Sequence, residues 1–252
     1  MKRKFLKAGI LSFFILAVLA AGIFLASKYF FSQEAVVNRE KDALPSAVAQ
    51  NSVPIVSAQA TSTRVPDQIN WDVPFTSQAP NANWDLTHEE ACEEAALLMA
   101  QKYFEKDGFT SPDDAETGLQ GIISWENKYL GFFESTTAEQ TAQVARGALG
   151  LKAEVIDTPS VSEIKAVLAS GKLLILPEAG QQIGNPFYTA PGPLYHMLLL
   201  KGYTADQFIT NDAGTKRGEN YPYPFKTVLD ANHDWNGRDG ADGAKRAILI
   251  WK

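Results

Sequence analysis

The stretch Thr87-His88-Glu89-Glu90-Ala91-Cys92-Glu93-Glu94-Ala95-Ala96-Leu97-Leu98-Met99 holds the only cysteine of the chain. Its apolar residues recur at the spacing of one helix face, and the pattern ends at Gly108. A single thiol cannot form an internal disulfide bond. Cys92 is therefore a small buried apolar residue, half of an intermolecular crosslink, or a nucleophile that needs a base.

A base for this nucleophile is offered by His196, which opens an apolar run over residues 196–202. A second run over residues 207–211 follows after a turn near Ala205, so the two runs predict a β-hairpin. Asp212 comes directly after the second strand, at the edge of the sheet where the strand of His196 begins. Nucleophile, base and orienting acid would then come together.

The order of elements predicts an α+β fold rather than a doubly wound one, because helices gather before an antiparallel sheet. Thr137 and Gln140 form a possible capping box for a helix that ends at Gly150. A further helix is expected at residues 161–169, and strands at 151–156, 173–176, 196–202, 207–211 and 247–251.

A cysteine attacks as its thiolate, and the pKa of a free thiol, about 8.5, must fall to make that form abundant. The N-terminus of a helix and a neighbouring imidazolium both lower it. A zinc hydrolase is a competing interpretation, because His88 and Cys92 would share a face of a continuous helix. In that site Glu89 would be the base and His196 a third ligand.

Four segments taken in order resemble the C39-like, papain-fold cysteine peptidases. They are Val73-Pro74-Phe75-Thr76-Ser77-Gln78, Cys92 with Ala95-Ala96-Leu97, His196 at the head of its strand, and Asn211-Asp212 before a glycine. The resemblance spans roughly residues 73–251. It implies a papain-like fold of N-terminal helices on an antiparallel sheet, Cys92 as nucleophile, His196 as general base, Asp212 as orienting acid and Gln78 as an oxyanion donor.

The chain departs from the family pattern at two places. Glu93-Glu94 stand where the family usually has Gly and often Pro, and residues 80–88 lengthen the gap between Gln78 and Cys92. Glutamates beside a thiol raise its pKa, and we expect the ones around Cys92 to be solvated, so that water and salt screen this effect.

The N-terminus predicts membrane attachment. Residues 8–27 are an uncharged apolar run behind four cations, and about 20 such residues cross a hydrocarbon core of roughly 30 Å. We expect a cytoplasmic basic tip and transmembrane signal anchor over residues 1–31, a flexible stalk over 32–68, and an extracytoplasmic C39-like peptidase domain over 69–252. A cleaved signal peptide with a secreted domain is the alternative.

Charge bears on the partners of the outer domain. The formal net charge of the chain is −6, and the excess of acids lies after residue 68, so a nucleic-acid partner is not expected. We predict a cysteine peptidase or amidohydrolase that forms a thioester, needs no cofactor or metal, and acts on a peptide or amide such as a cell-wall or surface peptide. A non-catalytic peptide-binding module on the same fold is the alternative from another class.

Overall fold

The computed structural model describes residues 2–50, 65–238 and 240–252, without the side chains of residues 2–17 and 20. It divides into residues 1–43 and residues 44–252. The first unit is helix α1 (Lys2–Asp42). In the described part of the chain, no helix combines the length and apolar character needed to cross a bilayer. Most of the predicted anchor falls on residues with undescribed side chains, so the anchor stays a prediction.

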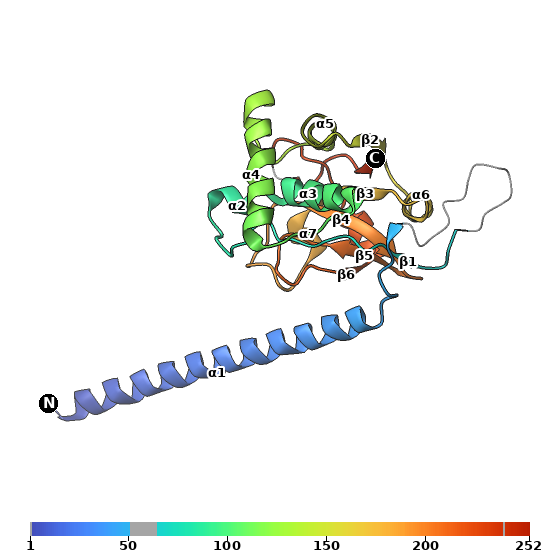
Figure 1. Ribbon diagram of the computed structural model, residues 1–252. Helices are drawn as coiled ribbons and strands as arrows, with labels where there is room; N and C mark the ends of the chain where they lie inside the picture. Colours follow the sequence, from blue (N-terminus) through green and yellow to red (C-terminus); the bar gives the residue numbers. More distant parts are fainter. Residues whose placement is uncertain (1, 51–64, 239) are drawn as a thin grey trace. The chain divides into compact units, whose positions relative to one another are not determined.

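The second unit is built on an antiparallel sheet (Figure 1). Its strand order is β2-β7-β3-β4-β5-β6, and β1 pairs separately with β4. The strands are β1 (Ile69–Asn70), β2 (Lys152–Asp157), β3 (Leu173–Ala179), β4 (Tyr195–Tyr203), β5 (Gln207–Asn211), β6 (Tyr221–Pro224) and β7 (Arg246–Trp251). Every residue of β3 and β4 is buried, so these central strands are covered on both faces.

Helices cover the sheet (Figure 1). Helices α3 and α5 pack against strands, and α4 packs on α3 and α5; α6, α7 and α8 also contact the sheet. The helices after α1 are α2 (Leu86–Glu89), α3 (Cys92–Glu105), α4 (Pro112–Tyr129), α5 (Ala138–Leu149), α6 (Val161–Ala169), α7 (Gly180–Ile183) and α8 (Phe225–Ala231). The prediction of an α+β fold is confirmed.

Local signals explain where several helices begin and end. Thr137 and Gln140 form the predicted capping box of α5, and Gly150 ends that helix at a φ of 64°. Ser160 and Glu163 form a second capping box at α6. Helix α4 was not predicted from the sequence, although Ser111 caps it and a proline follows at its first position.

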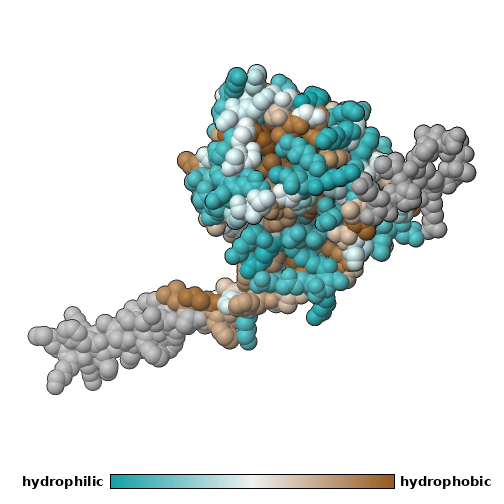
Figure 2. Space-filling model, viewed as in Figure 1, coloured by the Kyte–Doolittle hydropathy of each residue, from teal (hydrophilic) through white to brown (hydrophobic). Residues whose placement is uncertain are grey.

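The structure differs from the predicted stalk. Helix α1 continues to Asp42, and Val48 forms a bridge to Trp71. Trp71 is buried, and its indole N–H donates to the Leu168 carbonyl at 2.8 Å, near the C-terminal end of α6. Val48 of the predicted stalk is therefore paired with a residue that is fixed to the folded domain. The predicted stalk also covers residues 51–64, which lie outside the described residues. On the face shown in Figure 2, hydrophilic residues dominate the surface of residues 44–252, with hydrophobic areas between them.

Candidate active site

Cys92 is the first residue of α3 and lies against the start of β4. Its side chain is buried, with 5% of the residue surface exposed. The thiol donates to the Glu93 carboxyl, with Sγ and Oε2 at 2.9 Å. Burial raises the pKa of Cys92, and the carboxyls of Glu93 and Glu94 raise it further, while the backbone N–H of Met197 lowers it. The sulfur therefore lies beside the residue that follows His196.

His196 and Asp212 form a buried pair. The His196 Nε2 atom and the Asp212 Oδ1 atom are 2.9 Å apart, and the two side chains are 1% and 0% exposed. The second ring nitrogen, Nδ1, is not used by this pair. The Gly214 backbone N–H also donates to Asp212 Oδ1 at 3.0 Å. The strand pairing predicted from the sequence therefore brings these two side chains together.

Asp212 is held by three further donors on its other oxygen. The Asn185 amide, the Tyr188 hydroxyl and the Tyr223 hydroxyl donate to Oδ2 at 2.8, 2.8 and 2.6 Å. Burial alone would raise the pKa of Asp212, but His196 and the tyrosine hydroxyls lower it. Asp212 is therefore held as a carboxylate at the contact with the His196 ring.

Asn185 and Tyr223 were not among the residues predicted for this site. Asn185 follows the short helix α7, and Tyr223 lies on β6, so only the tertiary fold brings them to Asp212. Tyr188 also packs edge-on against the His196 ring, with centroids 5.4 Å apart.

Gln78 lies beside the loop that follows Asp212, and its side-chain amide already donates to two backbone carbonyls. Its backbone N–H donates to the Ala213 carbonyl, next to Asp212. Its side-chain Nε2 donates to the carbonyls of His88 and Glu89 at 2.8 and 3.0 Å. The structure thus positions Gln78 between the end of α2 and the loop after Asp212. Its role as an oxyanion donor stays a prediction.

The expectation that the glutamates near Cys92 are solvated was wrong for Glu93 and Glu94. Glu93 is 1% exposed and Glu94 is 0% exposed. Glu94 faces Glu126 of α4, and among the described residues their carboxyl oxygens have no donor other than the partner acid. Burial raises the pKa of all three acids: to about 8 for Glu93, to about 7 for Glu126, and well above the usual range for Glu94. A Glu pair can share a site in this way only when a proton remains bound.

His88 does not form a metal site with Cys92. The two residues belong to different helices, since α2 ends at Glu89 and α3 begins at Cys92. The His88 ring nitrogens contact Asp85 at 2.7 Å and Glu116 at 2.9 Å. Burial opposes the charged ring, but these two carboxylates raise the pKa of His88. Both ring nitrogens are occupied, so the zinc hypothesis is wrong in its geometry.

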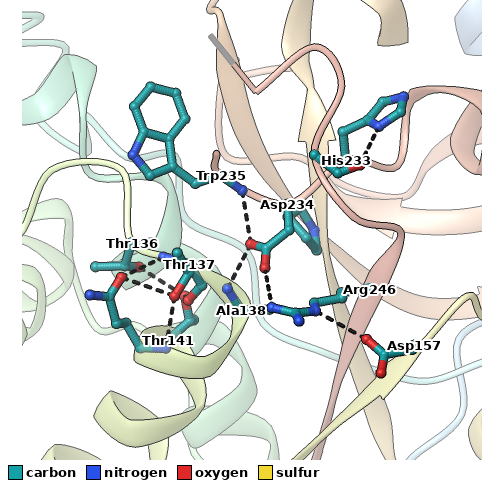
Figure 3. A network of polar contacts seen from close by, with 12 residues as sticks. Thr136, Thr137, Ala138, Thr141, Asp157, His233, Asp234, Trp235 and Arg246 are labelled. Carbon is teal, nitrogen blue, oxygen red and sulfur yellow. Dashed lines mark hydrogen bonds and ion pairs between the residues drawn. The ribbon is translucent and has the colours of Figure 1, made fainter. Parts of the chain in front are cut away.

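A polar network holds the turn that precedes α5 (Figure 3). This turn also contacts Glu93, the residue after Cys92. The Thr136 backbone N–H donates to Glu93 Oε1 at 2.9 Å, and the Tyr195 hydroxyl donates to the Thr136 carbonyl at 3.0 Å. Asp234 accepts from the Ala138 backbone N–H at 2.8 Å and from Arg246 at 3.0 Å. The residues adjacent to Cys92 and His196 are therefore joined through one fixed turn.

The family comparison accords with this geometry. The model of the Peptidase_C39 like family matches residues 70–241, more than half of the chain. The chain belongs to the C39-like peptidase family. The match includes all four predicted site residues, Gln78, Cys92, His196 and Asp212.

Two further comparisons concern solved structures and curated proteins. A crystal structure from Bacillus anthracis, described as a candidate C39-like peptidase, is 16% identical and has a TM-score of 0.46. The alignment covers 72% of this chain and 95% of that chain. A search of curated proteins finds no match. This C39-like peptidase family member has an α+β fold, and its family indicates a cysteine-peptidase type of hydrolase.

Proposed function

We propose that this protein hydrolyses a peptide or another amide through Cys92 as nucleophile, His196 as general base and Asp212 as the acid that orients His196. The observation that carries the proposal is the buried 2.9 Å contact between His196 and Asp212, at the end of the strand against which Cys92 packs. Asp212 binds Nε2, which leaves Nδ1 to exchange a proton with the thiol.

The reaction follows from this arrangement. The Cys92 proton passes to His196 Nδ1, and the sulfur forms a bond to the carbonyl carbon of the substrate. His196 then gives the proton to the leaving amine as the carbon–nitrogen bond breaks, and a thioester remains. Water attacks the thioester after giving a proton to His196, and the acid leaves with the thiol restored. Gln78 would stabilise the oxyanion after exchanging a backbone carbonyl partner for the substrate oxygen.

A non-catalytic peptide-binding module is the second candidate. Two observations favour it: the Cys92 thiol is buried with a raised pKa, and the Gln78 amide donates to two carbonyls. Such a module would bind a peptide without forming a thioester. The rate at which Cys92 reacts with an electrophile separates the two candidates.

The test uses the full chain and iodoacetamide, with alkylation of Cys92 measured by mass spectrometry between pH 5 and 10. A catalytic dyad gives a rate plateau below pH 8 that His196→Gln removes. His233→Gln is the matched control, because the His233 ring bonds to the Gly243 carbonyl and has no part in the proposed reaction. A rate that rises only above about pH 8.5 in both proteins would favour the binding module.

A second assay measures turnover directly. The wild-type chain should cleave members of a library of internally quenched peptides, and Cys92→Ala should abolish this cleavage without lowering the thermal unfolding midpoint. Undiminished cleavage by Cys92→Ala would refute the proposed nucleophile. We also propose that the domain acts on the extracytoplasmic side of the membrane, on the basis of the basic residues before the apolar run 8–27.

A further inference from the structure

Glu93 contacts the reacting sulfur but has no part in the proposed reaction. Its Oε2 atom lies 2.9 Å from Cys92 Sγ, and its Oε1 atom accepts the Thr136 backbone N–H at 2.9 Å. The side chain is 1% exposed, so bulk water does not solvate its carboxyl. The carboxyl therefore has a fixed position at the thiol.

The groups around Glu93 are acidic or neutral. Burial foremost, and then the Glu94 carboxyl, raise the pKa of Glu93 to about 8, while the bonds from Cys92 and Thr136 oppose this. The groups that face Glu93 from the neighbouring elements are Cys92 and Glu94 on α3, Glu126 on α4, Tyr195 on β4 and the Thr136 backbone N–H. The Asp234 carboxylate lies beside the same Tyr195 hydroxyl. The cation of this network, Arg246, binds Asp234 (Figure 3).

We propose that Glu93 acts as a neutral carboxylic acid that donates a hydrogen bond to the Cys92 thiolate, and that ionisation of Glu93 returns Cys92 to the unreactive thiol. This inference rests on the proposed function, because it requires that His196 accept the thiol proton.

The two protonation states of Glu93 have opposite effects on the sulfur. When Glu93 is neutral, its O–H can donate across the same 2.9 Å contact after the thiol proton has moved to His196. When Glu93 is ionised, it can only accept a hydrogen bond, so it stabilises the S–H form, and its negative charge repels the thiolate. The proton then returns from His196 to sulfur. A rise in pH therefore first lowers the reactivity of Cys92, whereas an isolated thiol only becomes more reactive.

The experiment compares pH profiles of iodoacetamide alkylation for the wild-type chain and Glu93→Gln. The wild-type rate should fall about tenfold or more between pH 7 and pH 9, as expected for a like charge close to the sulfur. Glu93→Gln should not show this fall, because its amide keeps one acceptor for Thr136 and one donor for sulfur but cannot ionise. Glu89→Gln removes an exposed carboxylate near Cys92 and should keep the wild-type profile.

The outcomes separate this inference from the proposed function. A fall of the same size in Glu93→Gln, or a wild-type rate that never falls between pH 7 and pH 9, would overturn the role of Glu93. The wild-type profile alone decides the matter if Glu93→Gln does not fold, as judged by thermal unfolding. The base is tested independently, since His196→Gln should remove the plateau at neutral pH. If His196→Gln loses the plateau and Glu93→Gln keeps the wild-type profile, the Cys92–His196 dyad is supported and only the role of Glu93 is refuted.

Discussion

The buried acids Glu94 and Glu126 should make the protein less stable as the pH rises. In the folded chain burial raises the pKa of Glu126 from 4.5 to about 7, and the pKa of Glu94 is raised further by burial and by Glu126. In the unfolded chain both groups ionise near their ordinary values. Between these values the folded state binds more protons than the unfolded state, so the free energy of unfolding falls as the pH rises.

The size of the effect follows from the pKa of Glu126. One pKa unit corresponds to about 1.4 kcal/mol, so the shift of Glu126 alone removes about 3 kcal/mol of stability between roughly pH 4.5 and pH 7. Glutamine at position 126 cannot ionise and can donate to an ionised Glu94. Glu126→Gln should therefore be more stable than the wild-type chain at pH 8 by up to about 3 kcal/mol. The difference should become small near pH 4.5, where Glu126 is protonated in the folded chain and only about half ionised in the unfolded chain.

Urea unfolding of the full chain at pH 4.5, 6 and 8 measures this difference. Glu105→Gln is the control, because it removes an exposed carboxylate from α3, the helix that carries Glu94, and should leave the pH dependence of stability as in the wild-type chain. A constant difference between Glu126→Gln and the wild-type chain from pH 4.5 to pH 8 would show that Glu126 ionises normally. The acid pair between α3 and α4 would then be refuted.

Three other substitutions test the support of the site. Tyr223→Phe removes a 2.6 Å donor from the buried Asp212 carboxylate, so we expect the free energy of unfolding in urea to fall by about 1.5–3 kcal/mol. The pKa of Asp212 should also rise, which would move the acid limb of the pH profile of peptide cleavage to higher pH. Gly218→Ala places a Cβ 1.7 Å from the Asp212 carbonyl oxygen and should reduce peptide cleavage, whereas Gly121→Ala, with open space around it, should not. Asp234→Asn weakens the contact with Arg246 at the turn before α5 and should cost about 1–3 kcal/mol in the same unfolding assay; no change would show that the network does not stabilise this turn.

The predicted features that the structure bears out depend on signals close together in the sequence. The capping box at Thr137 and the glycine at 150 define α5 through contacts within a few residues. The hairpin of β4 and β5 places His196 and Asp212 at one edge, because two antiparallel neighbours joined by a short turn have only one register that buries both strands. Here local pattern and tertiary structure agree.

The unpredicted features depend on contacts between distant segments. Glutamate is rarely buried, so a sequence with Glu93 and Glu94 in a first helical turn favours a solvated surface. Their burial requires α4, which supplies Glu126, and the turn before α5, which supplies the Thr136 backbone N–H. The start of α4 carried a readable signal in Ser111 and the proline after it, but nothing in that signal assigns Glu126 to the interior.

Burial also changes what the glutamates mean for the nucleophile. Solvated glutamates would be ionised at neutral pH, and they would oppose the positive potential that the N-terminus of α3 offers to a thiolate. The raised pKa of Glu93 and of Glu94 means instead that both carboxyls hold protons at neutral pH. The first turn of α3 is then nearly uncharged apart from the helix dipole. A Cys-Glu-Glu sequence that argues against a thiolate on a solvated helix is therefore compatible with one in this fold, because the fold keeps the acids neutral.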